Sequence, residues 1–212
     1  RLLSTFWALV PAVGEFRIGL NAVGAATAEK VAIFARSARA DKVKVELYDD
    51  SLTSLKYPRM WQMFHAPPPH SRFVMWWDDD SYMKSLNAAD WLAAVHSTMT
   101  GADMLGSVYT IVLQPGQVRR ITEQPWYGGK SPDKDRKGRP IARFATGGWW
   151  CIRSEFIEKY SWPPLEMVQH RGGDVLLGEL CRQQDLRLRH FNQGVAVNAD
   201  ELGRESKAPR RG

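Results

Sequence analysis

The apolar and polar positions of the chain fall into short runs that predict strands and longer periodic segments that predict helices. Continuous or alternating apolar runs predict strands over residues 43–47, 73–77, 104–112, 141–153 and 186–191. Apolar residues at helical spacing predict helices over residues 25–40, 52–64, 88–100, 154–160 and 174–184. The segment 5–12 fits either a first strand or a helix leading into Gly14. Strands that alternate with helices predict an α/β fold with a mostly parallel central sheet flanked by helices.

The length and composition of the chain agree with one domain of this kind. The 212 residues suffice for one sizeable core, and 44% hydrophobic with 25% charged residues is typical of a globular protein. We expect a single domain over residues 1–202. The segment 203–212 is rich in basic residues, proline and glycine, and is predicted to be a flexible tail.

Three consecutive carboxylates end the most apolar strand. Asp78, Asp79 and Asp80 directly follow the bulky run 73–77, which predicts a buried parallel strand. The carboxyl ends of strands form the ligand-binding edge of an open α/β sheet. Carboxylates so close together repel one another unless a cation offsets them, which favours a Mn²⁺ or Mg²⁺ site that holds a phosphate. The alternative is a solvated acidic turn in which Asp80 or Ser81 caps the next helix.

Two later blocks contain glycine beside groups that suit a binding site. Gly147 and Gly148 lie within a predicted strand and would let a ligand approach the backbone, and Trp149 and Trp150 follow them. Adjacent strand residues point to opposite faces, so one of these tryptophans belongs to the core and the other can stack on a sugar or a base. Asp174 stands at the start of a predicted helix, where it is either a reactive carboxylate or the N-cap.

These three blocks together resemble a known family. The strand that ends in Asp78-Asp79-Asp80-Ser81-Tyr82 resembles the Asp-x-Asp strand of nucleotide-sugar glycosyltransferases with the GT-A fold, and is most similar to the Fringe-like group. Residues 145–153 are similar to the Gly-Gly strand of that family, which lines the donor sugar. Residues 173–178 resemble the block that carries the catalytic base of inverting members, although Gly173 replaces the usual glutamate. The resemblance extends over residues 43–192.

The resemblance implies a metal-dependent, inverting transfer of a sugar from a UDP-sugar to a hydroxyl acceptor. It assigns the general base to Asp174, with Mn²⁺ or Mg²⁺ bridging the phosphates of the donor. The implied metal ligands are Asp80, Asp78 and, from its position near the end of the domain, His190. The implied donor contacts are Asp49 or Asp50 to the uridine, Asp78 and Asp79, and Gly147 and Gly148 to the sugar. A helix N-cap role for Asp50 and a structural role for His190 are the alternatives.

The charge of the chain points to an anionic partner. The net charge is +6 at pH 7, with a pI near 9.4. Many of the basic residues lie between residues 114 and 143, which predict a long irregular loop with interleaved aromatic residues. Basic and aromatic side chains together suit a nucleic-acid surface, and the alternative is a solvated flexible loop. The candidate acceptor contacts are Arg119, Arg120, Trp126, Tyr127, Trp149 and Trp150.

These features favour DNA as the acceptor. Viral enzymes that glycosylate hydroxymethylated pyrimidine bases have a similar character, and their chemistry requires a base turned out of the duplex. The alternatives are transfer to a protein or a cell-surface glycan, a metal-dependent nucleotidyl- or phosphoryltransferase, and a noncatalytic nucleic-acid-binding module.

The remaining sequence features concern location. No run of 18 apolar residues and no secretory signal is evident, and Cys151 and Cys181 are expected to be buried, reduced thiols. We therefore expect a cytoplasmic enzyme without a membrane span, in the host cytoplasm if the protein is viral.

Overall fold

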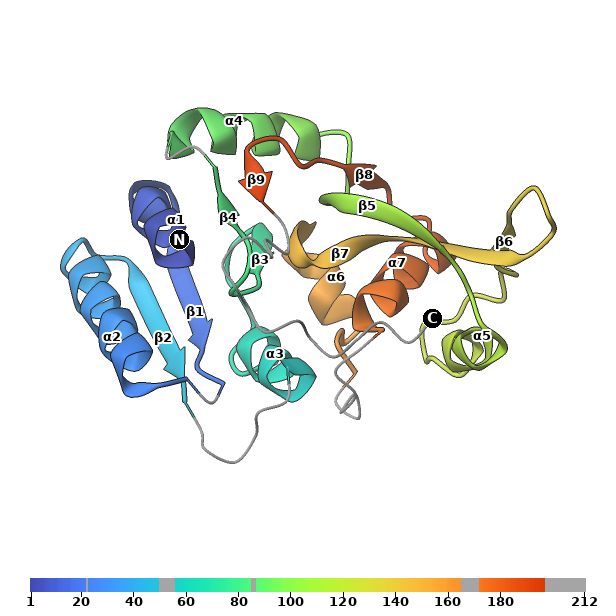
Figure 1. Cartoon of the computed structure of the whole chain (residues 1–212), viewed down its shortest axis with the longest axis horizontal. Coiled ribbons are helices and arrows are strands. Elements are labelled where there is room, and N and C mark those ends of the chain that lie inside the picture. The colour runs from blue at the N-terminus through green and yellow to red at the C-terminus, as the bar shows by residue number, and fades with distance from the viewer. Residues whose placement is uncertain (22, 50–55, 85–86, 165–171, 197–212) are drawn as a thin grey trace.

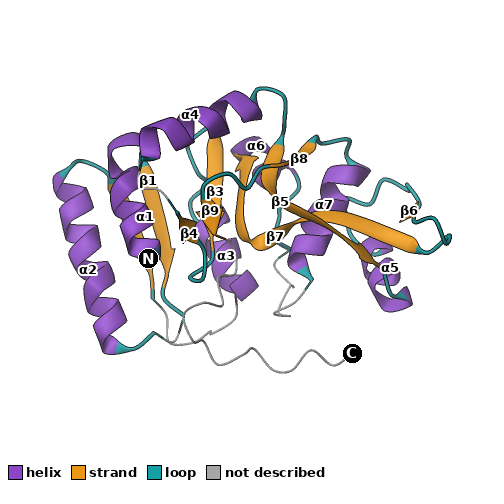
Figure 2. Ribbon diagram, turned by 45° about the horizontal axis from the view of Figure 1, so that its top comes forward, coloured by secondary structure: helices purple, strands orange, loops and turns teal. Residues whose placement is uncertain are grey.

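The computed structural model has helices on both sides of a central sheet, which confirms the predicted α/β class (Figures 1 and 2). It describes residues 1–21, 23–49, 56–84, 87–164 and 172–196. The helices are α1 (Leu2–Leu9), η1 (Val10–Ala12), α2 (Ala25–Ala40), α3 (Lys56–His65), α4 (Ala88–Met99), α5 (Pro115–Thr122), α6 (Ser154–Lys159) and α7 (Gly173–Gln183). The strands are β1 (Glu15–Gly19), β2 (Lys44–Tyr48), β3 (Phe73–Trp77), β4 (Tyr82–Met83), β5 (Met104–Val112), β6 (Asp133–Lys134), β7 (Pro140–Arg153), β8 (Leu188–His190) and β9 (Val195–Ala196).

The central sheet is mixed, so the prediction of a mostly parallel sheet is wrong for the strands described. Its order is β3-β7-β5-β8, and β6 also pairs with β7. β7 runs antiparallel to β3, β5 and β6, and only β8 is parallel to its neighbour β5. The sequence pattern could not show this, because an apolar run reads as a buried strand whichever way its neighbours run. β1 and β2 form a separate parallel pair, and β4 pairs with β9.

β7 separates two clusters of buried side chains. Trp149 belongs to the cluster that also contains Phe34 and Trp91, and Trp150 to the one that contains Trp162 and the α7 side chains. Neighbouring strand residues point to opposite faces, and each face of β7 therefore contributes one tryptophan to a core. Burying side chains of this size stabilises the fold by about 1.5–3 kcal/mol each.

The segment 114–143 is more regular than predicted. It contains α5, β6 and the start of β7 instead of one long loop. Pro115 occupies the first turn of α5, and the Gln117 side chain accepts a hydrogen bond from the Gln114 backbone N–H at 2.8 Å. These are ordinary helix-start signals, which the basic composition of the segment obscured.

The N-terminal segment resolves the choice left open by the sequence, since residues 2–9 form α1 and not a strand. None of the helices in the described ranges is long and apolar enough to cross a bilayer. Cys151 and Cys181 are buried and form no disulfide, as predicted. Burial raises the pKa of each thiol to about 12.

Candidate active site

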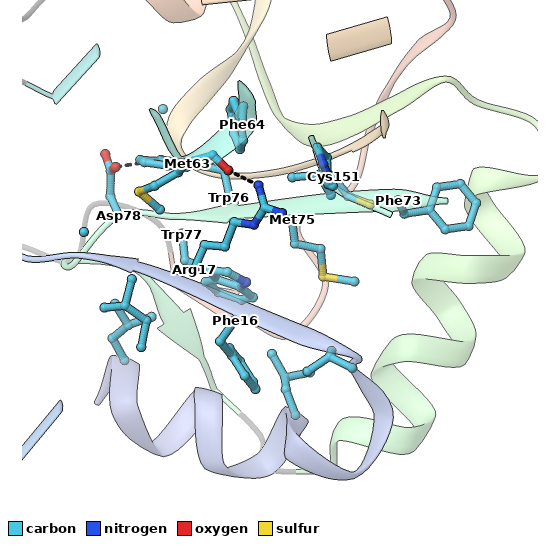
Figure 3. Close-up of a pocket in the computed structure, with 18 of the residues that line it drawn as sticks. Phe16, Arg17, Met63, Phe64, Phe73, Met75, Trp76, Trp77, Asp78 and Cys151 are labelled. Atoms are coloured by element: carbon cyan, nitrogen blue, oxygen red, sulfur yellow. Dashed lines mark hydrogen bonds between the residues drawn. The ribbon is translucent and has the colours of Figure 1, made fainter. Parts of the chain in front are cut away.

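A cavity of about 1570 Å³ lies between β1 and β3 and continues to the carboxyl end of β3 (Figure 3). β3 pairs with β7 through one edge, and its other edge faces this cavity, with Trp76, Trp77 and Asp78 among the lining residues. Gly147 and Asp174, from β7 and α7, line the same cavity. Three separate sequence blocks therefore meet there.

Asp78 is fixed by three hydrogen bonds. Its backbone N–H donates to the Gly148 carbonyl oxygen at 2.8 Å, which joins the end of β3 to the Gly-Gly segment of β7. Its Oδ1 accepts from Trp76 Nε1 at 2.8 Å, and its Oδ2 accepts from Lys56 Nζ at 2.8 Å. The side chain is 19% exposed, so water contributes little of its solvation. Both carboxylate oxygens therefore already have protein donors.

Lys56 is a site residue that no sequence motif singled out. It is the first described residue of α3, and its side chain is 17% exposed. Besides Asp78, its Nζ reaches the Gly147 carbonyl oxygen at 3.4 Å and lies 5.5 Å from the centre of the Trp76 ring. Sequence reasoning missed it because a lone lysine at a helix start matches no motif, and only the folded chain brings it to β3 and β7.

Gly147 is the point where the charged groups converge. A Cβ atom at this position would lie 3.1 Å from Lys56 Nζ, 3.8 Å from Asp78 Oδ2 and 3.9 Å from Asp174 Oδ2. The missing side chain thus makes room for the lysine ammonium group and for two carboxylates. The contact of Gly147 and Gly148 with a sugar stays a prediction.

Asp174 lies in the first turn of α7 and is half buried. Burial raises the pKa of its carboxyl group, while the charge of Lys56 and hydrogen bonds from the backbone N–H groups of Asp174, Val175 and Gly147 oppose the rise. A carboxylate that accepts a proton more readily than usual suits a general base.

The glycine at position 173 has a steric reason. Its backbone N–H donates to the Tyr57 hydroxyl oxygen at 3.0 Å. A Cβ atom at Gly173 would lie 2.2 Å from Tyr57 Cζ, closer than any two unbonded carbon atoms can approach. The tyrosine ring occupies the space that a glutamate side chain would need. Burial, followed by the charge of Asp174, raises the pKa of Tyr57.

The predicted metal ligands do not come together. Asp78, Asp80 and His190 all lie in the described part of the chain, in which no group of three or more His, Cys, Asp or Glu side chains could hold a metal ion. His190 Nδ1 accepts the backbone N–H of Val108 at 3.0 Å, beside the bulge of β5 between Gly106 and Val108. This contact gives His190 a structural role in holding β5 to β8, and its role as a metal ligand stays a prediction. Asp78 is instead paired with Lys56, and we assign no reaction step to a metal ion.

The rest of the acidic triplet forms a tight turn. The Ser81 backbone N–H donates to the Asp78 carbonyl oxygen at 3.0 Å, and exposed Asp79 lines the cavity. β4 follows, and the next helix, α4, is capped by the Asn87 side chain, which accepts the Asp90 N–H at 3.3 Å. The alternative reading of Asp80 or Ser81 as a helix N-cap is therefore wrong as well.

Of the two predicted uridine contacts, Asp49 is exposed just after β2, and Asp50 lies outside the described residues. Among the predicted acceptor contacts, Trp149, Trp150 and Trp126 are only 0%, 1% and 6% exposed. All three side chains are packed in the cores and offer no face on which a base could stack. Their prediction as acceptor contacts is therefore wrong.

The other predicted acceptor contacts remain at the surface or near it. Tyr127 is half buried, and the Arg119 side chain is 79% exposed in the last turn of α5. Arg120 Nη1 comes within 3.5 Å of the Cβ position of Gly172, the residue that precedes α7. Arg120 therefore reaches the same end of α7 as Asp174.

No protein-family model matches the chain, and no curated protein sequence matches it. Among solved structures, it is similar to a CMP:2-keto-3-deoxy-manno-octonic acid synthetase complexed with CTP, with a TM-score of 0.41 and 12% identity, over 89% of this chain and 76% of that one. It is also similar to mouse xyloside xylosyltransferase 1 in its apo form, with a TM-score of 0.43 and 11% identity, over 90% and 78%. Both TM-scores lie below 0.5, so these likenesses decide nothing about this chain, and its chemistry has to be argued from the site.

Proposed function

We propose that the protein is a glycosyltransferase that moves a sugar from a nucleotide-sugar, with UDP-sugars as the favoured class, to a hydroxyl acceptor. The observation that carries the proposal is the convergence of Asp78, Gly147 and Asp174, from three distant segments, on one cavity. The resemblance of the same three segments to GT-A glycosyltransferases supports it. The cavity volume exceeds the 300–1000 Å³ typical of small-ligand sites, which leaves room for a donor and part of an acceptor.

In the proposed reaction the acceptor hydroxyl oxygen attacks the anomeric carbon. The new carbon–oxygen bond forms as the bond to the phosphate oxygen breaks, and the electron pair of that bond leaves with the nucleoside diphosphate. Asp174 Oδ2 takes the hydroxyl proton, for which its raised pKa suits it. An attack opposite the leaving group inverts the anomeric carbon.

For the acceptor we propose a hydroxymethylated pyrimidine base in DNA. The basic α5 supports this, because Arg119 is exposed and Arg120 lies beside the N-terminal end of α7, where a phosphate of the acceptor strand can be bound. Tyr109 is 54% exposed and lines the cavity, so it can stack on an extruded base in place of the buried tryptophans. A protein or glycan acceptor is the second candidate.

The test is a transfer assay with a panel of UDP-sugars and four acceptor conditions: hydroxymethylcytosine DNA, hydroxymethyluracil DNA, unmodified DNA and none. Nucleosides are analysed by mass spectrometry, with and without Mn²⁺. We expect a hexose-sized mass gain on a hydroxymethylated base. Asp174→Asn should reduce the rate by about 10²–10⁴-fold. The matched control is Asp185→Asn, whose carboxylate is 86% exposed beyond the far end of α7.

The other outcomes separate the alternatives. Donor hydrolysis without DNA modification would keep the glycosyltransferase and move the search to glycans and proteins. A mass gain that contains phosphate would indicate a nucleotidyl- or phosphoryltransferase. DNA binding that is unchanged in Asp78→Ala, without turnover of any donor, would indicate a noncatalytic nucleic-acid-binding module.

A further inference from the structure

The position of Lys56 leads beyond the proposed function, on which this inference rests. We propose that the Lys56 ammonium group takes the place of a divalent cation at Asp78 and binds the diphosphate of the donor. Asp78 is the carboxylate that the family resemblance assigns to a metal or to the ribose, and its Oδ2 is 2.8 Å from Lys56 Nζ. A positive charge at this point can offset the negative charge that develops on the leaving diphosphate.

The surroundings of Lys56 hold a cation in place. Asp78 Oδ2 and the Gly147 carbonyl oxygen, at 2.8 and 3.4 Å, supply negative charge, and the Trp76 ring lies 5.5 Å from Nζ. Such an arrangement of acidic and carbonyl oxygens is the kind of environment that a metal ion would also occupy. The two cannot use Asp78 Oδ2 together, so Lys56 and a divalent ion compete for it.

The Lys56 ammonium group lies close to the space that a side chain at position 147 would occupy. A Cβ atom on Gly147 would lie 3.1 Å from Nζ, which is tighter than most real contacts of this kind. Lys56 also lines the cavity together with Asp78, Gly147 and Asp174, so its ammonium group is within reach of a ligand there. A lysine that served only to tie α3 to β3 would not need to line the cavity.

The charge pattern favours a phosphate ligand. Lys56 has three donor hydrogens, and a diphosphate that displaces Asp78 from one of them would gain a charge-assisted hydrogen bond. Asp78 keeps its bonds from Trp76 Nε1 and to the Gly148 carbonyl oxygen, and therefore stays in place when Lys56 turns toward a ligand.

The experiment measures binding of UDP, inorganic pyrophosphate and uridine by isothermal titration calorimetry, with EDTA and separately with Mn²⁺. The wild-type chain should bind UDP and pyrophosphate in EDTA. In Lys56→Met both affinities should fall by about tenfold or more, because a hydrogen bond to a charged group is lost, while uridine binding stays unchanged. Mn²⁺ should restore part of the UDP affinity in Lys56→Met, since Asp78 Oδ2 is then free to bind it.

Two further variants keep the test sharp. Lys44→Met is the matched control, because Lys44 pairs with Glu15 and Glu46 at 3.1 and 2.6 Å but does not line the cavity. Gly147→Ala keeps the charge but displaces Nζ, and should weaken pyrophosphate binding less than Lys56→Met does. Circular dichroism and thermal melting establish that each variant is folded.

The outcomes distinguish this inference from the proposed function. UDP binding that requires Mn²⁺ and is unchanged in Lys56→Met would overturn the inference and leave the glycosyltransferase standing. So would a lower melting temperature of Lys56→Met without loss of pyrophosphate affinity, which would make Lys56 a structural residue. Failure of the wild-type chain to bind any of the three probes and to turn over any donor would overturn both.

Discussion

The two ends of α7 hold their carboxylates in opposite ways. At the first turn, Asp174 faces the cavity, shares the positive charge of Lys56 with Asp78, and has a raised pKa. At the last turns, the Glu179 side chain is fully buried, and Arg182 donates to it through Nε at 3.0 Å and Nη2 at 2.7 Å.

The first turn of α7 therefore belongs to the candidate active site, and its last turns have a structural role. Arg182 also donates to the carbonyl oxygens of Ser131 and Lys130, and the Gln183 side chain accepts the N–H of Gly128 and donates to the Lys130 carbonyl. This end of α7 therefore fixes the segment that follows α5. A carboxylate satisfied so completely has no capacity left for chemistry, whereas Asp174 retains a tendency to take a proton.

The largest expected effect comes from breaking the structural end. Arg182→Met leaves the Glu179 charge buried without its partner, and should lower the free energy of unfolding by about 3–5 kcal/mol. Urea denaturation measures it. The control is Arg119→Met, whose partner Glu123 is at 3.6 Å and 63% exposed, and which should cost less than about 1 kcal/mol. Equal effects in the two variants would contradict the distinction.

Gly173→Ala tests the packing at the other end. The added Cβ would overlap the Tyr57 ring, and such overpacking costs about 1–3 kcal/mol. The free energy of unfolding should fall by that amount, and by less in a Tyr57→Ala background, where the ring is absent. Gly116→Ala in α5 is the control, because no atom lies within 4 Å of its Cβ position. It should stabilise the protein by about 0.5–1 kcal/mol.

A smaller effect of opposite sign is expected from Asp174→Asn. The folded-state pKa of Asp174 is raised above 3.8, its ordinary value, so the folded chain holds more protons than the unfolded one between these two pKa values. Stability contributed by this group is therefore present at low pH and lost as the pH rises through the folded-state pKa. Asp174→Asn should raise the melting temperature at pH 7, and the difference should vanish at a pH well below 4.

Glu179→Gln sharpens this comparison, because it removes the carboxylate charge with which Arg182 is paired. It should lower the melting temperature at pH 7. Calorimetric melts of both variants across the acidic range would show the two signs, and a melting temperature that falls in both would remove the contrast between the ends of α7.

The smallest effect is expected from Lys130→Met. Lys130 Nζ is 2.6 Å from Asp185 Oδ1, but the two side chains are 39% and 86% exposed. The free energy of unfolding should change by less than about 1 kcal/mol, and added salt should reduce the difference further. Denaturation at two salt concentrations measures it. A larger loss of unfolding free energy that does not depend on salt would show that Lys130, like Arg182, has a structural role.

Local patterns predicted most elements of the fold. The strand 104–112 has the predicted bounds, and the predicted helices 25–40 and 88–100 correspond to α2 and α4. The direction of β7 and the burial of Trp126 were beyond reach, because strand pairing and side-chain packing depend on contacts between distant segments. Motif spacing likewise grouped Asp78, Gly147 and Asp174. It missed Lys56, which joins them only through the fold.

The contact between Tyr57 and Gly173 couples two positions that are 116 residues apart. A chain that restores a glutamate at position 173 cannot keep a tyrosine ring at position 57, so the two residues have to change together. In a collection of related sequences we therefore expect them to vary as a pair: tyrosine with glycine, and a small residue with glutamate. A search pattern that requires the glutamate would pass over chains of the first kind, and one that treats the two positions as a unit would find both.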